Sequence, residues 1–173
     1  MTYQPMPAAS PRIAGALYLG IAVFGGFSIG YVPTVIVATG DPATTATNLT
    51  TNLGMFKLGV FADIGVILFE LALTAILYVM FRRISPVLST IGVISRAGMI
   101  TVMGVNLLTW VMPLTLLGGG TGFVGSEDIV MLFYKAHDLG VFVWQLFFGM
   151  HLLALGLIIL RSDLVPRLLG WGL

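Results

Sequence analysis

The sequence predicts an all-α integral membrane protein, a bundle of four transmembrane helices. Hydrophobic residues make up 58% of the chain and charged residues 9%, with a mean hydropathy of +1.04. The apolar residues gather in long runs, which is the pattern of multi-pass helical membrane proteins. The chain has no cysteine, which excludes disulfides and cysteine-ligated metals. Its net charge of +1, without a basic run, gives no indication of nucleic-acid binding.

The first predicted span covers residues 12–36. The segment before it is polar and rich in proline, without the charged start of a signal peptide, so we expect the span to remain in the membrane. Gly26 and Gly30 form a Gly-xxx-Gly pair, which predicts close packing against a neighbouring helix. Residues 37–56 are polar and form the outer loop, in which Asp41 and Pro42 favour the start of a short helix.

Three more spans are predicted at residues 57–81, 87–117 and 129–161. On a helical wheel, the last span separates into two lines. One line is a packing seam that carries Asp138, Gln145, Gly149 and Gly156, and the other carries His137, Trp144 and His151. Residues 162–173 break this helix and begin a fifth apolar segment, which is too short to cross a bilayer.

The charges next to the spans predict the orientation. Arginines lie on one side of the membrane, at positions 12, 82, 83, 161 and 167. The other side carries mainly acidic residues, at positions 41, 127 and 128. The positive-inside rule therefore places both termini in the cytoplasm.

Several phrases carry a family resemblance. They are RIAGALYLG, GDPATTATNL, FKLGVFADIGVILFELALTAILYVMFR, SPVLSTIGVISRAGMI and AHDLGVFVWQLFFGMHLLALGLIILRSDLVPRLLG. The chain resembles, from residue 12 to residue 170, the bacterial membrane family known as domain of unknown function 4386. Members usually have six helices, so the resemblance implies a short or truncated member in the bacterial inner membrane. It implies no reaction.

Three polar groups are predicted to meet near the bilayer centre. Counted from the cytoplasmic ends at about 1.5 Å per residue, Glu70, Arg96 and His151 all lie roughly 14–16 Å deep. An unpaired charge there costs at least about 2.5–3.5 kcal/mol, so we expect a Glu70–Arg96 ion pair with His151 nearby. The pair either clamps two helices or lines a path for a proton or a small polar solute.

A second polar layer is predicted nearer the outer face. It comprises Asp63, Asn106, Asp138 and Gln145, with Lys135 as counter-ion. This layer is either structural, with water around it, or the outer part of a relay that steps inwards towards Glu70.

The two histidines allow one further interpretation. His137 and His151 are fourteen residues apart, so their rings project from one side of the helix. Haem or (bacterio)chlorophyll ligation is therefore an alternative, although two shared haems would require a homodimer. The histidines lie about 21 Å apart and cannot share a metal ion.

The sequence has no hydrolytic or transfer motif, so we do not expect an enzyme. Small size and short loops favour a non-catalytic accessory subunit that packs against protein partners or further copies of itself in the lipid bilayer. The alternatives are a small proton-coupled transporter or channel that uses Glu70, Arg96, Asp63 and Asp138, and a tetrapyrrole-binding protein. No cofactor is predicted firmly.

Overall fold

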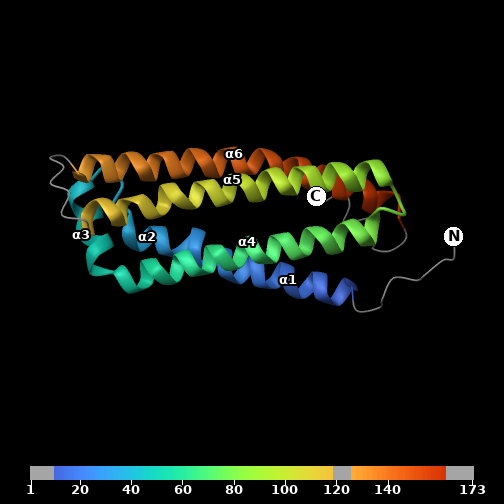
Figure 1. The fold of residues 1–173 in the computed structure, drawn as a ribbon, viewed down its shortest axis with the longest axis horizontal. Helices are drawn as coiled ribbons and strands as arrows, with labels where there is room; N and C mark the ends of the chain where they lie inside the picture. Colours follow the sequence, from blue (N-terminus) through green and yellow to red (C-terminus); the bar gives the residue numbers. More distant parts are fainter. Residues whose placement is uncertain (1–9, 119–125, 163–173) are drawn as a thin grey trace.

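The computed structural model describes residues 10–118 and 126–162. These residues form six α-helices and one π-helical segment (Figure 1): α1 (Ser10–Gly25), η1 (Gly26–Tyr31), α2 (Val32–Ile36), α3 (Pro42–Thr51), α4 (Leu53–Phe81), α5 (Pro86–Gly118) and α6 (Ser126–Leu160). Four helical stretches are long and apolar enough to cross a bilayer. The predicted fold class is therefore confirmed. The predicted fifth segment at residues 162–173 lies, after Ser162, outside the described residues.

The first span runs through a π-helical turn. Successive helices α1, η1 and α2 form one membrane-length stretch, in which the Val32 N–H donates to the carbonyl of Phe27, five residues earlier. Pro33 follows directly. A proline ring clashes with the carbonyl four residues before it in a regular α-helix, and a wider turn relieves this clash. The turn is thus a local consequence of Pro33.

The four spans form a ring that is open on one side. Helix α1 packs on α4, α4 on α5, and α5 most extensively on α6 (Figure 1). Within the described residues, α1 and α6 do not pack extensively on each other. We call the end with the α4–α5 connection the turn end, and the end that carries α3 the loop end.

Glycines allow α1 and α4 to interlock. A Cβ placed on Gly20 would lie 2.8 Å from the Phe69 ring, and one on Gly65 would lie 2.6 Å from the Phe24 ring. Each helix therefore inserts a phenylalanine over a glycine of the other. Gly26, Gly30 and Gly149, which were predicted to pack, have open space where a Cβ would stand. Among the described residues, these three glycines therefore make no close contact with another helix, whereas Gly156 is buried.

Apolar clusters close both ends of the bundle. The loop-end cluster joins α2, α3, α4, α5 and α6, and comprises Val32, Ile36, Leu49, Phe56, Trp110, Val130, Met131 and Tyr134. The turn-end cluster joins α1, α4 and α6, and comprises Ala14, Leu73, Leu77, Phe81 and Ile158. The buried charged side chains Asp63, Glu70 and Arg96 therefore lie between the two apolar clusters.

Candidate functional site

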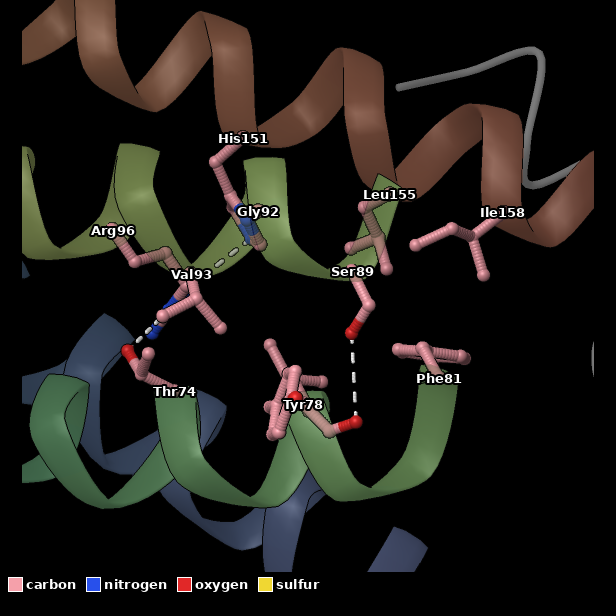
Figure 2. Close-up of a pocket in the computed structure, with 11 residues that line it drawn as sticks. Thr74, Tyr78, Phe81, Ser89, Gly92, Val93, Arg96, His151, Leu155 and Ile158 are labelled. Carbon is pink, nitrogen blue, oxygen red and sulfur yellow. Dashed lines mark hydrogen bonds between the residues drawn. The ribbon is translucent and has the colours of Figure 1, made fainter. Parts of the chain in front are cut away.

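A buried polar cluster joins α4, α5 and α6 in the half of the bundle nearer the turn end. Arg96 of α5 is 1% exposed and forms an ion pair with the Glu70 carboxylate of α4. Its Nε donates to the Thr74 hydroxyl at 2.8 Å, as Figure 2 shows for the side chain that reaches from α5 towards α4. The guanidinium has several N–H donors, and the Glu70 carboxylate and the Thr74 hydroxyl supply acceptors for them. Hydrogen bonds therefore stabilise the buried positive charge.

His151 of α6 completes this cluster. Its Nε2 lies 3.2 Å from Nη1 of Arg96. A guanidinium only donates, so Nε2 accepts and the ring proton stands on Nδ1. The Nδ1 atom is buried without a hydrogen-bond partner among the described residues. His151 is therefore a neutral acceptor for Arg96.

A small cavity lies beside the polar cluster. It measures about 20 Å³ and is lined by side chains that include Thr74, Ser89, Arg96 and His151 (Figure 2). This is the space of roughly one water molecule. The cluster can hold a proton or one water, but it has no room for a solute, and its geometry is that of a clamp between helices.

A larger cleft lies between the polar cluster and the loop-end cluster. It has a volume of about 310 Å³ and is bordered by η1 on one side and by α5 and α6 on the other. Its lining residues are Gly25, Gly26, Ile29, Gly30, Asp63, Met103, Asn106, Leu107, His137, Val141, Trp144 and Gln145. None of them lines the 20 Å³ cavity. The cleft and the polar cluster are thus separate sites.

Asp63 of α4 is the buried acid of this cleft. It is 7% exposed, and its Oδ1 has no hydrogen-bond partner among the described residues. Its polar neighbours are Ser28 and His137, and the Ser28 hydroxyl is itself buried without a partner. Lys135 is exposed and lines a different depression together with Asp128. The predicted role of Lys135 as counter-ion in this layer is therefore wrong.

The α5–α6 wall of the cleft is held by hydrogen bonds around Asn106. Its side-chain Nδ2 donates to the backbone carbonyl of His137 at 2.9 Å, and the backbone carbonyl of Asn106 accepts from His137 Nδ1 at 3.2 Å. The amide lies directly over Gly140, where a Cβ would overlap Asn106 Oδ1. The His137 ring also packs on Trp110, with ring centroids 5.0 Å apart. His137 is therefore oriented by its neighbours, and its Nε2 is its remaining acceptor.

The structure divides the predicted site residues into three groups. Glu70, Arg96 and His151 meet in the polar cluster. Asp63, Asn106, Gln145 and His137 line the cleft. Asp138 joins neither site and is exposed on α6. Sequence reasoning missed Ser28, whose signal is a single hydroxyl between Gly26 and Gly30 within a membrane span.

The histidines do not share a tetrapyrrole site in this arrangement. Both face α5, but His137 lines the cleft, whereas Nε2 of His151 contacts Arg96. The cavity at His151 holds about 20 Å³, which is far too small for a porphyrin. A tetrapyrrole ligated by His151 therefore does not fit this geometry.

Comparison with known proteins gives one match. No curated protein and no solved structure is significantly similar to the chain. A family model described as a domain of unknown function matches residues 13–173, which is nearly the whole chain. The resemblance of the sequence phrases is thereby confirmed. The chain belongs to the DUF4386 family, whose description gives the membership but no activity.

Proposed function

We propose that this protein is a small membrane transporter, with the 310 Å³ cleft as its solute site and Asp63 as the ionisable group of that site. The observation that carries the proposal is the buried Asp63 carboxyl, whose Oδ1 has no partner among the described residues. An unpaired charge within a membrane span costs at least about 2.5–3.5 kcal/mol. The carboxyl is therefore expected to take up either a proton or a positively charged solute, and these two compete for it.

The polar cluster has a different part in this proposal. Glu70 and Arg96 pair across α4 and α5, and His151 adds α6 through the same guanidinium. This linkage supports a rigid arrangement of α4, α5 and α6 on the turn-end side of the cleft, because the three helices must move together unless the ion pair is broken. Tyr18 of α1 lies beside Arg96 and connects α1 to the same cluster. Among the described residues η1 does not pack extensively on α6, so η1 is the part that we expect to move.

We also propose the bacterial inner membrane as the location, with the turn end in the cytoplasm. Support comes from the charges: Arg12, Arg82, Arg83 and Arg161 lie next to the turn end of the spans, and Asp41, Glu127 and Asp128 lie at the loop end. Cytoplasmic loops carry the excess of arginine and lysine in such membranes. Both termini are then cytoplasmic.

Proton movement tests the transport proposal. Purified protein is placed in liposomes that contain a pH-sensitive dye, and a membrane potential is imposed. Small molecules extracted from the protein's native membrane are then added. We expect solute-dependent proton movement with the wild type and with the matched control Asp138→Asn, since Asp138 is exposed outside the cleft. Asp63→Asn should abolish it. Equal proton movement with Asp63→Asn and the wild type would contradict the proposal.

A second proposal is a non-catalytic subunit of a larger membrane assembly. The exposed face of α6 favours it, because Asp138 and Gln145 lie there among exposed leucines such as Leu139 and Leu146. Polar groups on a lipid-facing surface are commonly satisfied by another helix. The test is the mass of the assembly after mild extraction. A single chain without a partner would rule this proposal out.

A further inference from the structure

We propose that the cleft binds a lipid-partitioning amine, an apolar molecule with a protonated ammonium group that pairs with Asp63. This inference rests on the proposed function, because it takes the cleft as the solute site and names the chemical class of the solute. Three features of the cleft support it: its buried acid, its apolar walls and its open side.

The charge of the site selects a cation. Asp63 offers a buried carboxylate oxygen, Oδ1, without a close hydrogen-bond partner among the described residues, and the Ser28 hydroxyl lies beside the carboxylate. On the opposite wall, the bond from His137 Nδ1 to the Asn106 carbonyl leaves His137 Nε2 as an acceptor. An ammonium group has three donors and no acceptor, so it matches a carboxylate, a hydroxyl oxygen and an imidazole nitrogen. A carboxylate ligand would place a second negative charge beside Asp63.

The walls select an apolar body. Between the polar groups, the cleft is lined by Ile29, Met103, Leu107 and Val141, and by the indole of Trp144. Trp144 is held by stacking on Phe148, with centroids 5.1 Å apart. Ligand pockets commonly measure about 300–1,000 Å³, so a volume of 310 Å³ fits a small molecule with one ring or a short chain. An indole face also attracts cations.

The open side selects a ligand that comes from the bilayer. The loop-end cluster covers the cleft on one end, and the polar cluster and the turn-end cluster lie at the other. Towards the lipid, the mouth of the cleft carries exposed residues of η1 and α6, among them Ile29, which is 42% exposed, and Gln145. A molecule that enters between η1 and α6 must first dissolve in the membrane. An apolar amine does so, whereas a highly polar solute does not.

Three probes of the same skeleton test this inference: 4-phenylbutylamine, 4-phenylbutanol and 4-phenylbutyrate. Binding to the purified full-length protein in detergent is measured by calorimetry and by the change in tryptophan fluorescence. Because a charge-assisted hydrogen bond is lost in the alcohol, we expect the amine to bind roughly ten- to a hundredfold more tightly than the alcohol. The butyrate should bind most weakly.

Variants connect this preference to the cleft. Asp63→Asn should make the affinities for amine and alcohol equal, and Asp138→Asn should preserve the preference for the amine. Gly26 lines the cleft with open space at its Cβ position, so Gly26→Leu is expected to narrow the mouth without disturbing the fold. It should weaken amine binding, whereas Gly15→Leu, which also has open space but lies outside the cleft, should not.

The outcomes separate the inference from the function on which it rests. Alcohol or butyrate binding as tightly as the amine would overturn the amine inference, and so would amine binding that Gly26→Leu and Asp63→Asn leave unchanged. In either case, proton movement that depends on Asp63 would still support transport of another solute. If the wild type shows no solute-dependent proton movement but binds the amine selectively, the transport proposal is overturned and the amine-binding site remains.

Discussion

At the scale of single residues, the main feature of this apolar chain is its buried ion pair. Glu70 and Arg96 are both buried and are paired with each other, and Arg96 also contacts Thr74 and His151. The cost of burying either charge alone exceeds that of burying the pair, so each residue stabilises the structure only while the other is present.

A double-mutant cycle tests this interdependence. Glu70→Gln or Arg96→Met alone should lower the free energy of unfolding by about 3–5 kcal/mol, because each leaves one buried charge without its partner. The double variant should recover most of this loss. Unfolding in mixed micelles with increasing denaturant measures all four proteins. Additive losses would show that the two side chains do not act as a pair.

Asp41 provides a pH-dependent contact at the start of α3, outside the membrane spans. Two hydrogen bonds from Thr44, one from its N–H at 2.9 Å and one from its hydroxyl at 2.6 Å, lower the pKa of Asp41 below its ordinary value of 3.8. A lowered pKa in the folded state means that the contact stabilises α3 above the ordinary pKa. This stabilisation is lost as the pH falls through the lowered value.

Amide hydrogen exchange measures this effect. At neutral pH, Asp41→Ala should increase the exchange of the Thr44 amide, because its acceptor is removed. In the wild type, protection relative to Asp41→Ala should begin to decrease as the pH falls below about 4, and it should disappear only once the pH has passed below the lowered pKa of Asp41. Glu127→Ala should leave Thr44 unchanged. Protection that persists in Asp41→Ala would show that the carboxylate does not cap α3.

At the scale of elements, glycines decide how closely the helices approach. The α5–α6 pair is the most extensive packing in the bundle, and Gly140 lies there beneath the Asn106 amide. The same amide donates to the His137 carbonyl. The wall of the cleft therefore depends on a residue without a side chain.

Gly140→Ala should displace Asn106 and break its bond to His137. We expect a loss of roughly 1–3 kcal/mol in the free energy of unfolding, the usual result of overpacking. Gly149→Ala on the same helix is the control, because a Cβ there has open space. It should be neutral or slightly stabilising. Equal stabilities of the two variants would contradict the close packing at Gly140.

At the scale of the whole molecule, the proposed transport depends on the open side of the ring. Helices α1 and α4 interlock, as do α5 and α6, and the two pairs are joined mainly by α4 and α5. The transport proposal requires η1 to approach or leave α6 while the polar cluster holds α4, α5 and α6 together.

Cross-linking tests the need for this opening. The chain contains no cysteine, so Ile29→Cys and Gln145→Cys introduce the only two thiols, one on each side of the mouth of the cleft. Joining them with a short bifunctional maleimide should stop solute-dependent proton movement. The double variant without the cross-linker should retain solute-dependent proton movement. Undiminished movement after complete cross-linking would show that this side need not open.

Sequence periodicity was sufficient for much of the architecture. Four apolar runs determined four spans, since a bilayer accepts only helices of sufficient length. Depth alone brought Glu70, Arg96 and His151 together, because a charge in hydrocarbon requires a partner and few partners lie at the same level. The short helix after Asp41 followed from local turn chemistry.

Tertiary structure alone decided which side of each helix faces which neighbour. Asp138 and His137 are adjacent in the sequence, yet Asp138 is exposed and His137 lines the cleft. Gly26 and Gly30 have the spacing of a packing motif, yet the π-helical turn places them at an opening. A sequence pattern gives the relative positions of residues on one helix, whereas the rotation of that helix and the gap beside it depend on the packing of all the others.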